Sequence, residues 1–330
     1  MEGAMANRPD EDDLIGRFFA PIAGPQGLGL RDDAALLIPP AGADIVITTD
    51  AVVAGVHFFA DDPPHAVARK ALRVNLSDLA AKGAEPLGFL LALALPEDWT
   101  TEWLAAFAKG LGEDAAAYRC PLFGGDTVKT PGPLMASITA LGRVESGRLV
   151  ARTGVRPDDA LYVSGAIGDA ALGLRVRRGL LPALAARHRD FLVDRYLLPR
   201  PRLALAPVLA RFASGGMDVS DGLVGDLAKM LRVSGVSARV ELAKLPLSAG
   251  ALAAVAADPA LFEIAATGGD DYEILASVAP RNAAAFEAGA AEVAVAVTRI
   301  GQAQAGAAPP RFFGRDGAEV AFGRGAYSHF

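Results

Sequence analysis

The sequence contains one cysteine, Cys120, among its 330 residues. A single cysteine excludes a disulfide within the chain and any metal or iron–sulfur site built from several thiolates. We expect Cys120 to be a small buried hydrophobic residue. Histidine is also scarce and shows no metal-ligand spacing, since the four occur at His57, His65, His188 and His329. A metal bound to this chain would therefore be held by carboxylates, which favours magnesium.

The sequence also has no long run of basic residues and no long run of apolar residues. The formal net charge is −6 and there is no long run of Lys and Arg, which argues against a nucleic-acid-binding surface. The most apolar stretch, Phe89 to Leu95, is far shorter than the roughly 20 residues that cross a bilayer. Residues Met1 to Asp13 are acidic and polar, without the apolar core of a signal peptide. We therefore expect a soluble, cytoplasmic protein with no membrane partner.

The sequence lacks the signature motifs of the two large classes of ATP-using enzymes. It has no G-x-x-x-x-G-K-[ST] loop and no paired H-R-D and D-F-G motifs. A phosphoryl-transfer enzyme with this sequence would belong to neither the P-loop enzymes nor the protein kinases.

The composition that is present is that of a globular protein. Hydrophobic residues make up 52% and charged residues 21%, and the length suits one large domain or two ordinary ones. Short β-branched runs alternate with longer Ala- and Leu-rich segments, which indicates mixed α and β structure. The turn-rich, charged segment Glu145 to Pro157 is the best boundary between two halves. We therefore predict domains at residues 1–148 and 149–330.

The local patterns predict the following elements. Helices are expected from about Pro64 to Lys82, with Gly83 as the C-terminal cap, and from Thr100 or Thr101 to Tyr118. Further helices are expected from about Asp169, after the proline-punctuated segment 198–202, and from Leu223. Strands are expected at residues 44–49, 88–95, 121–124, 134–144, 160–164, 216–220, 272–278 and 292–300.

The positions of the aspartates carry most of the chemical information. We expect Asp50, Asp126, Asp218 and Asp221 at or just past the ends of strands, where ligand sites of α/β proteins gather. Asp78 falls within a helical stretch, and Asp32 with Asp33 precedes an apolar run. Taken singly, each is more typical of a turn, a helix cap or a solvated face than of a ligand.

Taken together, the aspartates indicate a cation site if they converge. Two carboxylates at 4 Å repel by about 4 kcal/mol at an effective dielectric near 20, so a cluster of them needs cations. Magnesium bound to one or two carboxylates and to substrate phosphates is a common arrangement. The glycines of Gly124-Gly125-Asp126-Thr127 would allow backbone amides to approach a phosphate closely.

As a set, the motifs resemble thiamine-monophosphate kinase from about Asp32 to Phe330. The segments that carry the resemblance are 31–35 (RDDAA), 48–50 (TTD), 55–58 (GVHF), 70–81 (KALRVNLSDLAA), 124–127 (GGDT), 152–154 (RTG), 164–169 (SGAIGD), 217–223 (MDVSDGL), 268–273 (GGDDYE) and 327–330 (YSHF). The resemblance implies the two-domain α/β (α+β) fold of aminoimidazole ribonucleotide synthetase and selenophosphate synthetase. In that fold the N-terminal domain dimerises, and ATP lies between it and the C-terminal domain.

The resemblance also implies roles for individual residues. Several magnesium ions would be held by Asp33, Thr48, Thr49, Asp50, Asp78, Asp126, Asp218 and Asp221. ATP would contact Gly125, Asp126, Arg152 and Ser220, together with Tyr118. Thiamine monophosphate would meet His57, Asp270 and Tyr327. Two positions depart from the family: Arg31 replaces a glycine before the Asp pair, and Asp270 replaces a glutamate, which shortens the carboxylate by one methylene.

The implied reaction needs little proton chemistry. The second pKa of a phosphate monoester is about 6, so the attacking oxygen is already anionic near neutral pH, and we assign no general base. Arg152 would add a fixed positive charge and paired donors for phosphate.

Other functions on the same fold stay open. Selenophosphate synthetase is disfavoured because its reactive residue lies near the N-terminus, far from Cys120. Aminoimidazole ribonucleotide synthetase is disfavoured by the Asn75-Leu76-Ser77-Asp78 and His57 segments. Another ATP-dependent enzyme of this superfamily, or a non-catalytic nucleotide or metal sensor, remains the alternative.

Overall fold

The computed structural model describes residues 11–31 and 34–323. The chain forms two compact units. The first unit consists of Met1–Leu79 and Pro86–Glu145, and the second of Ala80–Glu85 and Ser146–Phe330. The predicted mixed α and β structure in two halves is confirmed.

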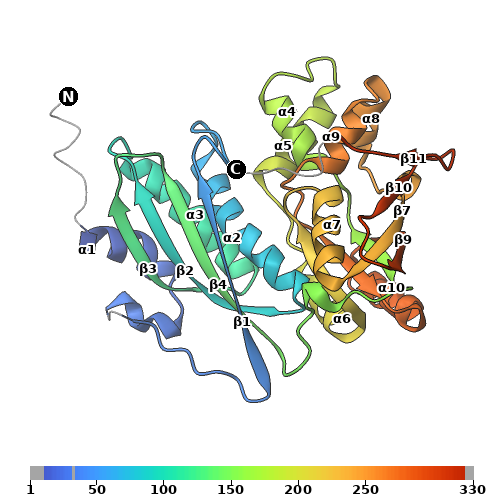
Figure 1. Ribbon diagram of the computed structural model, residues 1–330. Coiled ribbons are helices and arrows are strands. Elements are labelled where there is room, and N and C mark those ends of the chain that lie inside the picture. The colour runs from blue at the N-terminus through green and yellow to red at the C-terminus, as the bar shows by residue number, and fades with distance from the viewer. Residues whose placement is uncertain (1–10, 32–33, 324–330) are drawn as a thin grey trace. The chain divides into compact units, whose positions relative to one another are not determined.

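The first unit is built on a four-stranded sheet with the order β1-β4-β2-β3. Its strands are β1 (Ala43–Val53), β2 (Glu85–Leu95), β3 (Leu122–Lys129) and β4 (Met135–Glu145). β1 and β4 are antiparallel, whereas β2 and β3 are parallel. Figure 1 shows α2 (Pro64–Ala81) and α3 (Thr101–Ala117) on one face of this sheet. Short turns of helix precede it: α1 (Glu11–Leu14), η1 (Ile15–Phe19), η2 (Ala20–Ile22) and η3 (Pro25–Leu30).

The two faces of this sheet differ because side chains alternate along a strand. On β4, Ala136, Ile138 and Ala140 are buried on the helix-covered face, and the residues between them are partly exposed. On the other face, Ile47 is 65%, Leu90 39% and Val128 49% exposed. The second face, which we call the open face, is therefore uncovered within one chain and partly apolar.

The predicted caps of the first unit are confirmed. The Thr100 hydroxyl accepts a hydrogen bond from the Trp103 amide at 3.1 Å and begins α3. Gly83 has φ +72°, the left-handed conformation expected just after α2. Cys120 is fully buried, and burial raises the pKa of its thiol to about 12, so it behaves as the expected core residue.

The second unit contains a seven-stranded sheet with the order β11-β10-β7-β9-β5-β8-β6. The strands are β5 (Ala160–Ser164), β6 (Ala213–Val219), β7 (Val236–Glu241), β8 (Glu273–Val278), β9 (Val297–Ala305), β10 (Arg311–Phe313) and β11 (Glu319–Val320). Only β7 and β10 pair in parallel, and the other neighbours are antiparallel. The helices are α4 (Asp169–Arg177), α5 (Ala186–Leu197), α6 (Ala206–Phe212), α7 (Leu223–Ser234), α8 (Ala249–Ala257), α9 (Leu261–Thr267) and α10 (Ala283–Glu292), with short turns η4 (Arg152–Gly154), η5 (Leu203–Leu205), η6 (Leu242–Lys244) and η7 (Pro280–Asn282).

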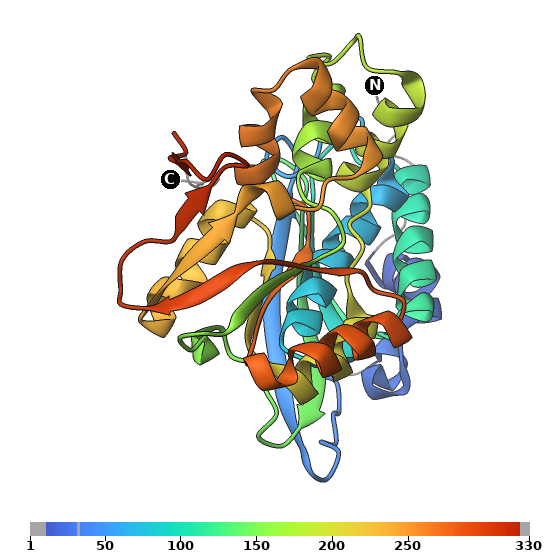
Figure 2. The ribbon, with the colours of Figure 1, turned by 90° about the vertical axis from the view of Figure 1, so that its right-hand side faces the viewer.

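Helices cover both faces of the seven-stranded sheet, as Figure 2 shows. On β5, Leu161 and Val163 point into a core shared with α7. Tyr162, between them, points into the opposite core with α6 and α10. The helices α4, α5, α8 and α9 bury a third apolar cluster among themselves. The alternation on β5 therefore fixes which helices lie on which face.

The segment Ala80–Glu85 belongs to the second unit although its flanking residues belong to the first. Ala80 and Ala81 are buried in the core formed with α6 and α10. Lys82 donates from Nζ to the carbonyl of Gly216 at 2.8 Å, and its own carbonyl accepts the Val150 amide at 3.2 Å. These contacts anchor the segment to β6.

Several predicted bounds are wrong. β3 continues to Lys129, five residues beyond the predicted end at Gly124. The last predicted strand, 292–300, starts only at Val297, because Glu292 is the final residue of α10. The Ala- and Val-rich sequence here suits both states, so composition alone did not separate helix from strand. Within residues 11–31 and 34–323, no helix is long and apolar enough to cross a membrane.

Candidate functional site

Thr48 and Asp78 come together in the first unit. Thr48 lies on β1 and donates from its hydroxyl to Asp78 Oδ2 on α2, at 2.5 Å. Asp50 lies two residues further along β1, so alternation places it on the same face of the sheet as Thr48. These three residues supply oxygen ligands from a strand and from the helix that covers it.

The Thr49 side chain lies on the open face. Its hydroxyl donates to the carbonyl of Ile138 at 3.1 Å and accepts a hydrogen bond from Thr139 at 3.1 Å. Thr139 is its direct partner in the β1–β4 register. The predicted pair Thr48 and Thr49 therefore presents its two hydroxyls to opposite sides of the sheet.

Asp126 also lies on the open face, on the other edge strand. It pairs with Ala92, an exposed residue of β2, and is itself exposed. β1 and β3 are separated by β4 and β2, so three strand spacings place Asp126 about 14 Å from Asp50 across the sheet. One ion cannot bind both carboxylates of a single chain.

The structure corrects the expectation that the aspartates mark strand ends. Asp50 lies inside β1 (Ala43–Val53), and Asp126 lies inside β3 (Leu122–Lys129). Only Asp218 and Asp221 lie close to the end of their strand, β6 (Ala213–Val219). The expectation fails because β1 and β3 continue beyond the predicted strand ends at residues 49 and 124, so the aspartates that follow those residues still lie within the ladder.

Gly125 is required by close packing of the backbone. A Cβ at this position would lie 1.9 Å from the carbonyl oxygen of Leu91 on β2. At Gly124 the nearest atom would be a Leu90 methyl at 3.6 Å, an ordinary contact. The paired glycines predicted to admit a phosphate are therefore not equivalent: only Gly125 has no room for a side chain.

His57 and Tyr118 are both held in the first unit. The Val53 amide donates to His57 Nδ1 at 3.0 Å, which leaves Nε2 as the protonated nitrogen of the neutral ring. The buried Lys70 donates to the His57 carbonyl at 3.0 Å. Tyr118 caps the C-terminus of α3, with the Arg73 guanidinium 5.7 Å from its ring centroid. Both predicted ligand-contacting residues are thus fixed by neighbouring elements.

In the second unit, Asp221 lies beside a buried ion pair. Lys229 Nζ is 2.5 Å from Asp221 Oδ2 and 3.0 Å from Asp226 Oδ1. Asp226 also accepts the Asp221 amide at 2.8 Å and is fully buried. Burial raises the pKa of the Asp226 carboxyl, against the hydrogen bond from Lys229. The ammonium of Lys229 occupies the kind of position that a metal cation would take beside Asp221. Asp218, on β6, is also buried.

The Gly268 to Glu273 loop lies against Ser220. The Asp270 amide donates to the Ser220 carbonyl at 2.8 Å, and the Tyr272 amide to the Val219 carbonyl at 2.9 Å. Tyr272 has φ +51°, a value that bulky residues rarely adopt and that often marks a functional site. Asp270 has φ +74°, which aspartate tolerates more easily. The loop therefore brings Asp270 to Ser220 and places backbone strain at Tyr272.

Arg152 lies away from that loop. Its carbonyl accepts a hydrogen bond from Ser234, the last residue of α7, at 3.1 Å. Ser220 lies three residues before Leu223, the first residue of α7. The helix has 12 residues and is therefore about 18 Å long. The structure therefore places Arg152 and Ser220, two predicted ATP contacts, at opposite ends of α7. The predicted residues Asp33 and Tyr327 lie outside the part of the chain that the structure describes.

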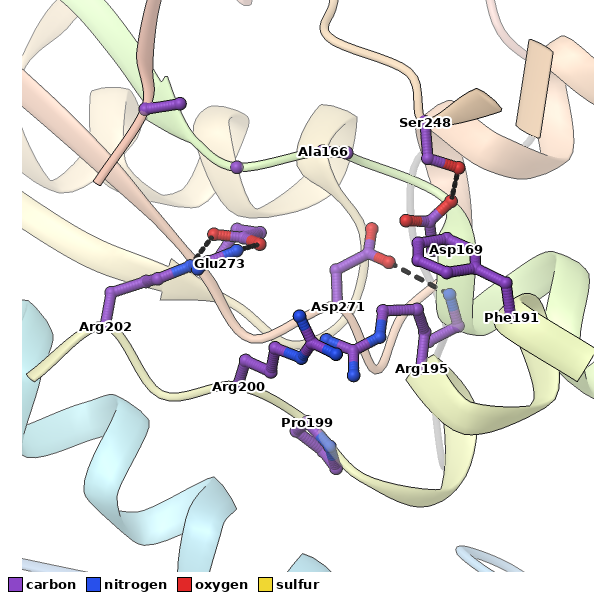
Figure 3. Close-up of a pocket in the computed structure, with 13 residues that line it drawn as sticks. Ala166, Asp169, Phe191, Arg195, Pro199, Arg200, Arg202, Ser248, Asp271 and Glu273 are labelled. Atoms are coloured by element: carbon purple, nitrogen blue, oxygen red, sulfur yellow. Dashed lines mark hydrogen bonds and ion pairs between the residues drawn. The ribbon is translucent and has the colours of Figure 1, made fainter. Parts of the chain in front are cut away.

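A network that the sequence reasoning missed lies next to the same loop, and Figure 3 shows its Glu273–Arg202 pair and Asp271. Glu273 pairs with Arg202 through two hydrogen bonds and also accepts from the Ser164 hydroxyl at 2.5 Å. Asp271 accepts the amides of Gly168 and Ala170, at 2.6 and 3.2 Å, at the start of α4. Both carboxylates belong to the GGDDYE segment and, apart from Arg202, their partners lie in or next to SGAIGD, so the signal was present in two quoted motifs in which these residues had been given no role.

The oxygen ligands suit a hard cation, although no complete site is formed. Among the residues described, no group of three or more His, Cys, Asp or Glu side chains is arranged to hold a metal ion. The side chains near Thr48 and Asp221 offer only carboxylate and hydroxyl oxygens, the ligands that magnesium prefers. Magnesium commonly takes one or two protein carboxylates and completes its shell with water and substrate phosphates. The residues present therefore fit that ion.

Comparison with known proteins places this arrangement in a family. Residues 31–144 match the family described as AIR synthase related protein, N-terminal domain, and residues 156–309 match the corresponding C-terminal domain. The two matches together cover most of the chain. The fold and its motif-bearing loops are therefore those of the AIR synthase related proteins.

Curated relatives narrow the placement. A thiamine-monophosphate kinase of Caulobacter vibrioides is 44% identical over 315 residues, which are 93% of this chain and 88% of the relative. One of Escherichia coli strain K12 is 39% identical over 323 residues, 97% of this chain and 98% of the relative. The chain belongs to the thiamine-monophosphate kinase family, which confirms the resemblance read from the motifs.

Solved structures agree with this placement. The crystal structure of a thiamine-monophosphate kinase from Stenotrophomonas maltophilia K279a has a TM-score of 0.79 and 37% identity, and the match covers 88% of this chain and 91% of that one. A structure described as AaThiL complexed with AMPPCP and TMP has a TM-score of 0.77 and 30% identity, with 91% of each chain covered.

Proposed function

We propose that this protein transfers the γ-phosphoryl group of ATP to thiamine monophosphate, giving ADP and thiamine diphosphate. The observation that carries the proposal is the similarity to thiamine-monophosphate kinases over nearly the whole chain. One structural relative was solved with AMPPCP and TMP. The protein is thus an ATP-dependent phosphotransferase whose acceptor is a phosphate group, in the synthesis of thiamine diphosphate.

The residues of this chain would allow two polyanions, ATP and thiamine monophosphate, to bind at one site. The acceptor phosphate is largely deprotonated near neutral pH, so no general base is needed. Thr48, Asp50, Asp78, Asp126, Asp218 and Asp221 would hold magnesium, as would Asp33 and Thr49, which the resemblance adds. Bound magnesium supplies positive charge that offsets the phosphate repulsion and aligns an in-line transfer.

More than one metal position is needed. Thr48, Asp50 and Asp78 lie on the helix-covered face of the first sheet, whereas Asp126 lies on the open face about 14 Å away. A single ion within one chain cannot use both sets. This separation supports the proposal that several magnesium ions bind.

The remaining contacts follow the family. Gly125, Arg152, Ser220 and Tyr118 would contact ATP. Asp270 would meet thiamine monophosphate, with His57 and Tyr327. The strained backbone at Tyr272 and the tether of Asp270 to Ser220 support a functional role for that loop.

We propose that residues 1–148 bind ATP and metal and form a homodimer, and that residues 149–330 complete the ATP and substrate site. The exposed Ile47, Leu90 and Val128 of the open face support a second copy as its cover. Light scattering of the intact protein and of Ile47→Asp tests this, because the charged variant should dissociate. A cytoplasmic location stays a prediction that cell fractionation would test.

The test of activity incubates the purified protein with ATP, magnesium and thiamine monophosphate, and separates the products by chromatography. Asp126→Ala, a magnesium-free sample and Asp98→Ala run alongside. Asp98 is an exposed carboxylate in the loop after β2 and serves as the matched control. We expect ADP and thiamine diphosphate from the intact protein and Asp98→Ala only.

Two outcomes would contradict the proposal. If ATP is hydrolysed without a diphosphate product, the acceptor is a different molecule. If ATP and magnesium bind calorimetrically but no turnover occurs, the protein is a nucleotide sensor on this fold.

A further inference from the structure

A cavity of about 230 Å³ lies within the second unit, beside the GGDDYE segment, two of whose carboxylates line it. Its walls come from the loop after β5, from α5 and the segment that follows it, and from Asp271 and Glu273. None of the predicted ligand-binding residues that the structure describes lines it. The volume exceeds the roughly 10–15 Å³ that one water needs but is below the roughly 300 Å³ where sites for drug-sized ligands begin. It therefore suits a small ion or one end of a ligand, and not a nucleotide.

Each carboxylate in the wall already has protein donors. Glu273 is engaged by Arg202 Nε at 2.7 Å and by Ser164. Asp271 accepts two backbone amides at the start of α4. Asp169 Oδ1 accepts the Ser248 hydroxyl at 2.5 Å. The acidic wall residues are therefore tied to the fold, as Figure 3 shows.

The guanidinium group of Arg195 is less well matched. Arg195 Nη2 lies 2.5 Å from Asp194 Oδ2, and Arg200 Nη2 lies 3.6 Å from the same oxygen. Arg195 Nε is buried and has no hydrogen-bond partner in the structure. One carboxylate oxygen thus serves two guanidiniums, and a buried donor remains unsatisfied, which costs free energy.

The chemistry of these donors selects the ligand. Guanidinium forks match the oxygens of phosphate, and two of them can share one dianion. The ring of Phe191 and the ring of Pro199 form part of the wall, and such apolar surfaces strengthen ionic contacts by excluding water.

We propose that this cavity binds a phosphate dianion, either inorganic phosphate or the monoester phosphate of thiamine monophosphate, between Arg195 and Arg200. The proposal goes beyond the kinase assignment and does not depend on it. Bound phosphate would supply an acceptor for Arg195 Nε and would place its negative charge beside the guanidinium of Arg200.

The test measures binding to the full-length protein by isothermal titration calorimetry in EDTA, without magnesium or ATP. The probes are inorganic phosphate, thiamine monophosphate and thiamine. The variants are Arg195→Gln, Arg200→Gln and Arg211→Gln, with Asp126→Ala as a fourth. Arg200 is 58% exposed, so its replacement leaves the fold intact even if Arg195→Gln does not. Arg211 is an exposed arginine on α6 outside the cavity.

We expect inorganic phosphate to bind at one site, and Arg200→Gln to weaken that binding at least tenfold. Arg211→Gln and Asp126→Ala should bind as the intact protein does, which separates this site from the metal-dependent one. If thiamine monophosphate competes with phosphate and thiamine does not, the substrate is a source of the bound phosphate. If thiamine monophosphate does not compete, the ligand is free phosphate.

Two results would overturn the proposal. One is the absence of phosphate binding by the intact protein at millimolar concentrations. The other is equal binding by the intact protein, Arg195→Gln and Arg200→Gln. Neither bears on the kinase assay, which is run with magnesium and scored by product.

Discussion

Two carboxylates of the first sheet and three of the second unit are held in different ways. In the first unit, Asp50 and Asp126 are exposed on strands of a sheet. In the second, Asp226 and Glu273 are buried and paired with Lys229 and Arg202, and Asp271 caps α4. A buried charge must be matched by the fold, whereas an exposed one costs little and stays available. Asp50 and Asp126 should therefore matter for ligands, whereas Asp226, Asp271 and Glu273 should matter for stability.

The largest effect should come from breaking the Glu273–Arg202 pair. In Glu273→Gln, an amide group faces the guanidinium and leaves the charge of Arg202 without its partner. We expect the free energy of unfolding to fall by about 3–5 kcal/mol in urea titrations. Glu319→Gln, which removes an ion pair exposed to water with Arg311, should cause no measurable loss. Equal losses in the two variants would contradict the contrast between buried and exposed pairs.

A pH-dependent effect should follow from Asp169. Burial raises the pKa of its carboxyl to about 6, against the hydrogen bond from Ser248 and the charge of Arg195. The folded protein then binds more protons than the unfolded chain, whose Asp pKa is about 3.9, so stability falls as pH rises from about 4 to 6. The loss is at most about 3 kcal/mol.

Asp169→Asn should reduce this slope in urea titrations between pH 4 and 7. Burial also raises the pKa of Asp271 well above its ordinary value, so part of the slope should persist. Asp190→Asn, on the exposed side of α5, should leave the slope unchanged. A slope unaffected by Asp169→Asn would show that this carboxyl is not the titrating group.

An intermediate effect is expected at Gly125, where the first unit tolerates no change. Its added Cβ would meet the Leu91 carbonyl at 1.9 Å, so β2 and β3 must move apart in Gly125→Ala. We expect a loss of about 1–3 kcal/mol in unfolding free energy. Gly124→Ala is the matched control, with its nearest atom at 3.6 Å, and should be near neutral. Similar losses at both positions would indicate a general cost of removing glycine from β3.

The smallest effects on stability should accompany the metal ligands. Thr48→Val removes the hydrogen bond to Asp78 and should cost about 1 kcal/mol. Asp50→Asn, at an exposed position, should stay within about 0.5 kcal/mol. Both should weaken magnesium binding in calorimetry with ATP present, because each removes an oxygen ligand. Unchanged magnesium binding in both variants would remove these residues from the metal site.

The family and much of the secondary structure could be predicted from the sequence, because the patterns that indicate them involve residues close together in the chain. The helix over Pro64 to Lys82 and the Thr100 cap depend on neighbours within one turn, and both are confirmed. The strand-end argument for Asp50 and Asp126 failed because the length of a strand depends on pairings with distant segments, and both aspartates are paired within the sheet. Periodicity does not encode those pairings.

The candidate site was predicted as a set of residues but not as a geometry. The proximity of Thr48 and Asp78 was implied by the family, and the structure shows it. The Thr49 side chain points to the opposite face of the sheet from Thr48, which follows from the alternation of side chains once β1 is known. The positive φ of Tyr272 had no signal, because tyrosine is not a residue that favours that conformation. The pairing of Glu273 with Arg202 joins residues 71 positions apart, beyond any local pattern.

The small segment Ala80–Glu85 has a consequence for how the protein is made. It packs against β6, yet it is synthesised before any residue from Ser146 onward exists. On the ribosome, the N-terminal half must therefore hold Ala80 and Ala81 without their eventual neighbours. Cutting the gene near residue 150 would separate this hexapeptide from the half that needs it. Two such fragments should be stable only when they are produced together and reassociate.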